Sequence, residues 1–426
     1  EVRTALEQAL LMLKKYGLEP EMGHKEVGGV KAKIGEAGHL THVMEQLEID
    51  WKYSTGVQAA DNELLARIVI KEAFRRNGLE VVFKAKPIIG VAGSGKHTHL
   101  GIAAKLKSGK MVNLFTPTEP TKDFLSAVGY GALMGLLKNY EVVNPFITAT
   151  NDSLNRLKPG FEAPVCIVTS LGHTPEMPSR NRSILVGLVR DITNPMATRF
   201  ELRSPNPYTN TYIAIAASYL AMLDGIRFAV ESGKSTAELE AELSKPAGTP
   251  GSYLETERAY RSEHDIFDDY TPEERDRLFG HHPATVWENM QNLVKYPEKV
   301  AVLTASGALR QELIDAFVAG ALKRWQTELI SRIIPENLNT VKQCVCLHDS
   351  ETATDLDLFH WEKIVALKMY LAKDTIAHKS LFTRLKEALT SGEYSLASEL
   401  QKEMTAKMSE LEAIYAQYKR NMIHFC

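Results

Sequence analysis

The chain has 426 residues, of which 44% are hydrophobic and 24% are charged, and its net charge is −3 at pH 7. This composition is ordinary for a soluble protein, and the length allows two or three domains. The near-neutral charge argues against a nucleic-acid partner, and no membrane span is predicted because no run reaches the roughly 20 apolar residues that a span needs.

Helical and strand-like patterns alternate along the first half of the chain. Apolar residues at helical spacing predict helices over residues 3–16, 61–78 and 122–139. Asp61 is the expected cap of the second of these helices. Alternating or β-branched runs predict strands over residues 20–34 (with a bend), 81–86, 97–102, 111–115, 164–170, 183–190 and 197–203.

The second half of the chain is mainly helical in pattern, apart from a polar excursion predicted at the surface over residues 233–285. Helices are predicted over residues 209–231, 284–294, 307–333, 358–389 and 394–419. Pro335 marks the expected boundary between two parts. We therefore predict an α+β catalytic domain over residues 1–335, with an antiparallel sheet flanked by helices, and a helical C-terminal extension over residues 336–426.

The four cysteines form no CxxC pair. Cys344 and Cys346 together with His348 lack a fourth ligand, so a zinc site is not predicted. Without a disulfide framework, a reducing cytoplasm is the expected location.

A Gly-rich corner at residues 90–95 leads into Lys96 and His97 and nearly matches a phosphate-binding P-loop. His97 stands where a P-loop needs a hydroxyl group for magnesium, and the following residues alternate like a strand instead of starting a helix. Alternation places His97 and His99 on one strand face, where two imidazoles suit a metal ion and a phosphate. Two surface histidines are the alternative interpretation.

A second polar cluster lies in Arg199-Phe200-Glu201-Leu202-Arg203. Strand alternation puts Arg199, Glu201 and Arg203 on one face, with the two apolar residues behind them. A carboxylate between two guanidinium groups suits a cation and a phosphate held together, although a solvated strand face with ion pairs fits equally well. The charged segments 155–164 and 181–183 are weak signals when each is taken alone.

Taken together, these segments resemble the glutamine synthetase family. The resemblance is carried by His24–Gly28, Lys86-Pro87, Gly93–His99, Asn155–Pro164, Asn181–Ser183 and Arg199–Arg203. It covers about residues 1–335 and is closest to the large type III branch. It implies an ATP-dependent ligase that forms glutamine from glutamate and ammonia through a γ-glutamyl phosphate, with two or more Mg²⁺ or Mn²⁺ ions.

The resemblance also implies roles for individual residues. The expected metal ligands are Glu26, His97 and Glu201. The expected contacts to ATP are His99, Arg182 and Arg199. The expected substrate contacts are Gly93, Arg156 and Arg203. The expected catalytic residues are Glu162, Arg156, Arg182 and Arg203, with Glu162 screening the site and taking a proton from ammonium.

Some positions depart from the family pattern. A second metal glutamate is expected seven or eight residues after Glu26, where Lys33 and Ile34 stand; a cation there would repel a metal ion, and Glu36 is a candidate substitute. Further departures are Ala92 for an asparagine, Gly101 for a serine and Gly187 for an arginine that Arg190 could replace. Residues 171–179 read as an insertion near the site.

Family members carry an N-terminal β-grasp domain and a strand with two further metal glutamates, which we expect upstream of Glu1. The resemblance implies a homo-oligomer of hexameric rings or a dodecamer, with the C-terminal helices either packed on the catalytic domain or forming oligomer contacts. Within the family, Ala92 and the insertion favour a γ-glutamyl–amine ligase as one alternative. Lys33 favours a catalytically silent structural or regulatory relative as another, and a phosphotransferase on the same scaffold is a weaker rival.

Overall fold

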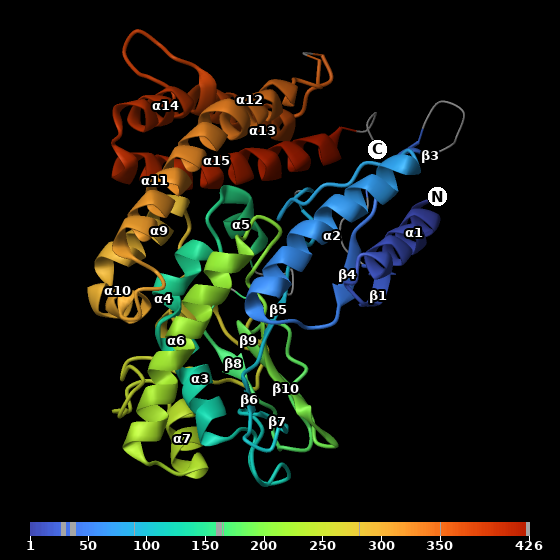
Figure 1. The fold of residues 1–426 in the computed structure, drawn as a ribbon. Helices are drawn as coiled ribbons and strands as arrows, with labels where there is room; N and C mark the ends of the chain where they lie inside the picture. The colour runs from blue at the N-terminus through green and yellow to red at the C-terminus, as the bar shows by residue number, and fades with distance from the viewer. Residues whose placement is uncertain are drawn as a thin grey trace. The chain divides into compact units, whose positions relative to one another are not determined.

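The computed structural model describes residues 1–26, 31–34, 40–88, 90–158, 164, 166–280, 282–349 and 351–422, with the backbone alone at 31–34 and 40–43. It divides into two compact units (Figure 1). The first comprises Glu1–His282 and Asn292–Leu313, and the second comprises Pro283–Gln291 and Ile314–Cys426. The predicted α+β architecture with a helical C-terminal part is confirmed, whereas the domain boundary after residue 335 stays a prediction.

The chain begins with a layer of two helices on a two-stranded antiparallel sheet. Helices α1 (Val2–Lys15) and α2 (Gly56–Arg76) share an apolar core with the sheet of β1 (Pro20–Lys25) and β4 (Leu47–Trp51). Both helices are followed by the glycines that the sequence marks, Gly17 and Gly78, with φ of 84° and 72°. The predicted cap is wrong, because α2 starts five residues before Asp61 at Gly56.

A second hairpin interrupts this small sheet. β2 (Lys31–Ile34) and β3 (Leu40–Met44) pair with each other. In sequence they lie between β1 and β4, which pair with each other in a separate sheet. The single bent strand predicted over residues 20–34 is therefore two strands in two different sheets. This insertion changes the spacing of residues that meet in the fold.

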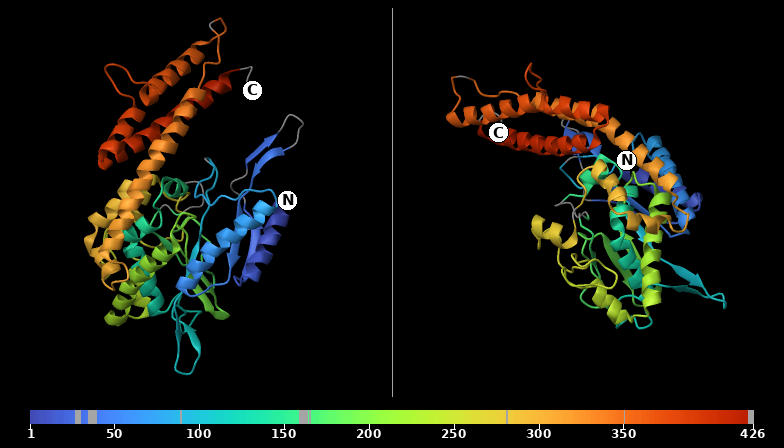
Figure 2. Two further views of the ribbon diagram at one scale, coloured as in Figure 1. Left: turned by 45° about the horizontal axis from the view of Figure 1, so that its top comes forward. Right: turned by 90° about the vertical axis from the view of Figure 1, so that its left-hand side faces the viewer.

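The central sheet has the order β5 (Thr98–Leu100), β10 (Asn194–Leu202), β9 (Val186–Asp191), β8 (Thr169–Ser170). Its pairs are antiparallel except for the short β8, which lies parallel to β9. The hairpin of β6 (Ala103–Lys105) and β7 (Met111–Asn113) projects beside it (Figure 2). Residues 81–86, all of them described, form no strand; Val81 and Phe83 instead pack on the N-terminal core.

Two apolar helices, α3 (Ala127–Lys138) and α6 (Thr211–Ser232), pack closely against each other through glycines. A Cβ atom at Gly225 would lie 2.1 Å from the carbonyl oxygen of Gly131 and 2.5 Å from the nitrogen of Gly135. Among the described helices, α6 alone is long and apolar enough to cross a membrane by length and composition. It packs against α3, and 39% of its apolar window is buried inside the structure.

The rest of the first unit connects and covers these layers. Its remaining helical segments are α4 (Tyr140–Val143), a 3₁₀ turn at Asn144–Phe146, α5 (Asn151–Arg156), α7 (Thr236–Leu243), α8 (Pro272–Phe279) and α10 (Pro297–Thr304). The prediction that residues 233–285 form a polar segment at the surface is wrong for much of that segment. Tyr260, Ile266 and Phe279 are buried there, and Ile266 and Phe279 share a core with Val168 and Ile184 beside the central sheet.

A buried ion network also stabilises this region. Lys299 lies 2.9 Å from Glu141 and 2.6 Å from Glu255, and Arg258 contacts both carboxylates. Although burial alone raises the pKa of Glu255, Lys299 and Arg258 outweigh it and hold that pKa below its usual value. The network therefore contributes stability when the Glu255 carboxylate is ionised.

We expect the first unit to lose stability as the pH falls below about 4.5. The folded state lowers the pKa of Glu255, so at falling pH this carboxyl group binds a proton more readily in the unfolded chain, which favours unfolding. Glu255→Gln removes this group, so the stability difference between wild type and variant should shrink between about pH 6 and pH 3. Urea unfolding across this range measures it. A difference independent of pH would contradict the assignment.

The second unit is helical. Its elements are α9 (Val286–Lys295, shared with the first unit), α11 (Gln311–Glu328), a π-helical turn at Leu329–Ile333, α12 (Ile334–Gln343), α13 (Asp355–Ala372), α14 (Leu381–Ser391) and α15 (Tyr394–Asn421). Pro335 lies in the first turn of α12, where proline is tolerated, so the helical run continues across it. The predicted helix over residues 358–389 is broken at residues 373–380, where Asp374 accepts hydrogen bonds from Ser380 and Thr383.

Candidate active site

Five polar side chains meet where β5 pairs with β10. The register sets Glu201 opposite His99, and Glu201 Oε1 lies 2.9 Å from His97 Nδ1. Arg203 donates a hydrogen bond of 2.8 Å to the same oxygen, and Arg199 donates one of 2.7 Å to His99 Nδ1. Phe200 and Leu202 are buried behind them. The predicted clustering of these residues on one face is confirmed.

The charges in this cluster suit a divalent cation. Burial alone raises the pKa of Glu201, but His97 and Arg203 outweigh it and lower that pKa to about 2. Burial, assisted by Arg199, lowers the pKa of His99 to about 4, and burial also lowers the pKa of His97. An ionised carboxylate and neutral imidazoles therefore coexist near neutral pH, which is the protonation state that metal binding requires.

Arg156 lies directly beneath the Gly-rich corner. Its guanidinium donates hydrogen bonds of 3.1 Å to the carbonyl oxygens of Arg203 and Ser204, and burial together with Arg203 lowers its pKa to about 10. A Cβ atom at Gly95 would lie 2.7 Å from Arg156 Nη2, and one at Gly93 would lie 2.9 Å from Arg156 Cγ. Gly93 and Gly95 lack side chains because Arg156 occupies the space that those side chains would need.

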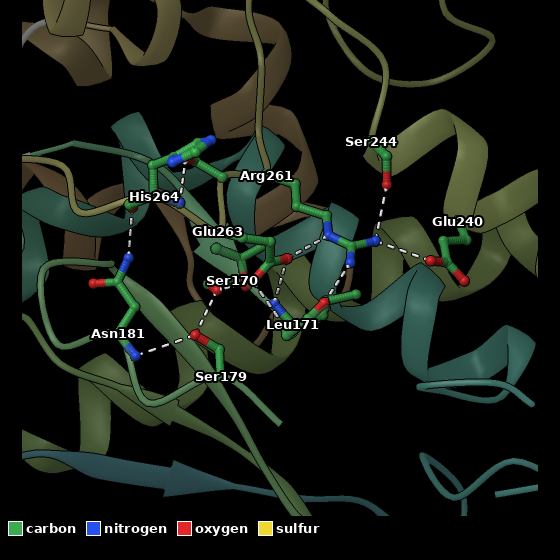
Figure 3. A network of polar contacts seen from close by, with 12 residues as sticks. Ser170, Leu171, Ser179, Asn181, Glu240, Ser244, Arg261, Glu263 and His264 are labelled. Atoms are coloured by element: carbon green, nitrogen blue, oxygen red, sulfur yellow. Dashed lines mark hydrogen bonds and ion pairs between the residues drawn. The ribbon is translucent and has the colours of Figure 1, made fainter. Parts of the chain in front are cut away.

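Hydrogen bonds hold the segment around Arg182 on two sides, of which the Asn181 side is seen in Figure 3. Asn181 donates a hydrogen bond of 2.7 Å to the His264 carbonyl and accepts one of 2.8 Å from the Ser183 amide. The Arg182 carbonyl accepts a hydrogen bond of 3.2 Å from Arg203 Nε. The backbone of Arg182 is therefore tied to the same arginine that contacts Glu201.

Residues 171–179, which the sequence predicts to be an insertion, form a loop closed at its base (Figure 3). Ser170 and Ser179 are joined by a hydrogen bond of 2.6 Å, and the Glu263 carboxylate accepts the backbone amides of Leu171 and Gly172 at 3.2 and 2.8 Å. Arg261 in turn lies 2.7 Å from Glu263. The loop is held by residues about 90 positions away, a contact that no local sequence pattern predicts.

Arg190 does not replace the arginine missing at position 187. Its guanidinium donates to the carbonyl oxygens of Pro120, Asp123 and Phe124, so it anchors that loop. Gly187 itself pairs with Glu201 in the sheet. The position expected to carry an arginine therefore does face the site, but without a side chain.

A second cluster brings His24, Glu26 and Glu48 together at β1 and β4. His24 Nε2 lies 2.9 Å from Glu26 and 3.6 Å from Glu48, and one ligand atom from each residue lies within 4.8 Å of the others. Burial and the neighbouring Glu26 raise the pKa of Glu48. Two carboxylates that repel each other beside an imidazole fit a divalent cation, since oxygen and nitrogen donors suit Mg²⁺ or Mn²⁺.

The position predicted for the second carboxylate differs from the one that the structure places beside Glu26. The counterpart of Glu26 was expected at residue 33 or 34, but Lys33 pairs with His42 in the β2–β3 hairpin, and Glu48 lies beside Glu26. The signal in the sequence is Leu47-Glu48-Ile49-Asp50-Trp51, a strand with alternating carboxylates. Glu36 lies outside the described residues. So do residues 159–163, which include Glu162. That Glu26, His97 and Glu201 share one metal-binding mouth stays a prediction.

These features define an α+β protein whose candidate site combines carboxylate and imidazole side chains with the buried arginines Arg156 and Arg203. Residues 1–247 match the family model described as the glutamine synthetase catalytic domain. The chain belongs to the glutamine synthetase family.

The chain is 36% identical to a glutamine synthetase of Clostridium saccharobutylicum over 212 residues, which are 49% of this chain and 43% of that protein. It is 32% identical to one of Nostoc sp. over 280 residues, which are 63% and 52% of the two chains. It thus spans about half the length of the curated relatives it matches. A Plasmodium falciparum glutamine synthetase structure has a TM-score of 0.52 at 21% identity, with 82% of this chain and 61% of that chain covered, which supports the fold.

Proposed function

We propose that this protein is a glutamate–ammonia ligase that uses ATP to form glutamine through a γ-glutamyl phosphate. The observation that carries the proposal is the pairing of His97, Glu201 and Arg203 across β5 and β10, where a metal ligand set and a phosphate-binding cation meet. Divalent Mg²⁺ or Mn²⁺, when bound, would neutralise charge on the transferred phosphoryl group.

In this proposal each cluster has its own task. Glu26 and Glu48, with His24, would hold one metal ion, and His97 with Glu201 would hold another. His99, Arg182 and Arg199 would bind the ATP phosphates, whereas Gly93, Arg156 and Arg203 would bind and orient glutamate. Arg203 can act on both substrate and phosphoryl group, since it already joins Glu201 to the Arg182 backbone. Glu162 would accept the proton from ammonium.

The partners implied by this function are glutamate, ammonia and ATP. We propose further a homo-oligomer in the cytoplasm, in hexameric rings or as a dodecamer, without a nucleic-acid or membrane partner. The family membership and the near-neutral net charge of −3 support this proposal.

A γ-glutamyl–amine ligase is the second candidate. Two observations favour it: Ala92 stands where the family pattern expects an asparagine, and the loop at residues 171–179 is rigidly closed by Glu263. Release of phosphate from ATP, measured with glutamate and either ammonia or a series of primary amines, separates the two. We expect the highest kcat/KM with ammonia; a higher value with an amine would replace the proposed substrate, and no turnover with any would favour a silent relative.

The Glu48→Gln variant is expected to bind Mn²⁺ at least about tenfold more weakly than the wild type. The change removes one of the two carboxylate charges facing His24 and keeps the size of the side chain. Titration calorimetry with Mn²⁺ alone measures the effect without requiring turnover. Glu21→Gln, an exposed carboxylate on the same strand β1, is the matched control and should leave the affinity unchanged. Equal affinities of wild type and Glu48→Gln would remove Glu48 from the metal site.

A further inference from the structure

Gln46 connects the two halves of the candidate site. Its side-chain amide donates hydrogen bonds of 3.0 Å to the Gly93 carbonyl oxygen and 3.3 Å to Ser94 Oγ. Its own backbone carbonyl accepts the Glu26 amide at 2.9 Å. A single half-buried residue therefore bonds both to the strand end that carries Glu26 and to the Gly-rich corner.

The contact fixes one peptide unit of the corner. The carbonyl oxygen of the Gly93–Ser94 peptide is bound by Gln46, and the amide nitrogen of the same peptide donates 2.9 Å to the Ala85 carbonyl. A peptide plane held by opposite edges cannot rotate without breaking a hydrogen bond. Gly93 is also confined from below, because a Cβ atom there would lie 2.4 Å from the Ala85 oxygen.

The same peptide lies beside Arg156, which continues the path to the cluster of His97 and Glu201. Arg156 bonds to the backbone of Arg203, and Arg203 bonds to Glu201 beside His97. A path of direct contacts thus runs from Glu26 through Gln46, the corner and Arg156 to Glu201. On this path Gln46 is the residue that links Glu26, at the end of β1, to the Gly-rich corner.

We propose that Gln46 is a positioning residue that couples the His24–Glu26–Glu48 cluster to the Gly-rich corner and so sets the shape of the glutamate subsite. This inference rests on the proposed function, in which Gly93 and Arg156 bind glutamate. Gln46 touches no reacting atom; it acts through the Gly93–Ser94 peptide. Its loss leaves the Gly93–Ser94 peptide with the hydrogen bond from Ser94 to the Ala85 carbonyl but without the one that holds the opposite edge.

The test is Gln46→Met, which keeps an unbranched side chain of similar length and removes the amide. We expect the backbone amides of residues 91–96 to exchange with deuterium about fivefold faster, as the loss of about 1 kcal/mol of hydrogen bonding predicts. We also expect the KM for glutamate to rise about tenfold, with the KM for ATP and kcat changed much less. Gln58→Met removes an exposed amide that bonds to Asn62 within α2 and is the matched control.

Unchanged exchange at residues 91–96 would overturn the proposal. So would faster exchange with an unchanged KM for glutamate in an active enzyme, because the role of Gln46 would then be structural only. If the wild-type protein shows no turnover and the exchange still responds in Gln46→Met but not in Gln58→Met, the coupling stands and the proposed ligase function fails.

Discussion

Replacing Arg203 by alanine is expected to lower turnover by about a hundredfold or more, with a much smaller change in the apparent affinity for ATP. Arg203 is buried, donates to the Glu201 carboxylate and holds the Arg182 backbone, so its guanidinium is fixed before substrate binds. A preorganised cation of this kind acts mostly where charge develops in the transition state. Steady-state kinetics with varied ATP and varied glutamate measures both parameters.

The conservative variant Arg203→Lys is the control for charge. It keeps a cation but cannot bond to Glu201 and Arg182 in the same forked geometry, so it should recover only part of the lost turnover. Thermal unfolding of both variants checks that the fold is retained. Unchanged turnover in Arg203→Ala would remove this residue from the proposed mechanism.

Gly225→Ala is expected to destabilise the first unit by roughly 3 kcal/mol or more, the largest stability effect that we anticipate. The added methyl group would lie 2.1 Å from the Gly131 carbonyl oxygen, and the nearby atoms are backbone atoms of α3 that no side-chain rotation can move. The two helices must therefore separate, which also opens the surrounding core. Urea unfolding followed by circular dichroism measures the loss.

Gly320→Ala is the matched control for the same chemical change. Gly320 lies within α11, and a Cβ atom there would have no neighbour within 4 Å. Alanine favours a helix over glycine by about 1 kcal/mol, so this variant should stabilise the second unit. Opposite signs in the two variants support close helix contact as the cause. A Gly225→Ala protein as stable as the wild type would exclude the tight crossing of α3 and α6.

Local sequence patterns predicted the part of the site that lies on adjacent strands. Alternation alone placed Arg199, Glu201 and Arg203 on one face, and the pairing of β5 with β10 confirmed it. Strand geometry has a period of two residues, so neighbours on a face can be identified without knowing the rest of the fold. The glycines after α1 and α2 were identifiable for the same reason, since a positive φ is a local requirement.

Relations between distant segments were decided only by the tertiary structure. Counting residues after Glu26 led to Lys33. In the structure the β2–β3 hairpin lies between β1 and β4 in sequence, and the pairing of β4 with β1 brings Glu48 beside Glu26. Spacing along a chain carries no information about how much of it forms a side hairpin. The assignment of the second carboxylate needed the register of two strands.

The polar stretch over residues 233–285 is a second case in which local sequence patterns did not predict contacts between distant segments. Its charged residues predict solvent exposure, yet Glu255 and Arg258 join Glu141 and Lys299 in a partly buried network, and Glu263 with Arg261 closes the loop at residues 171–179. A charged residue can be buried when partners from other segments neutralise it. The sequence by itself determined which residues carry charge and which strands place them on one face. The tertiary structure decided which charged residues contact one another, because the choice of partner depends on long-range packing that no local pattern encodes.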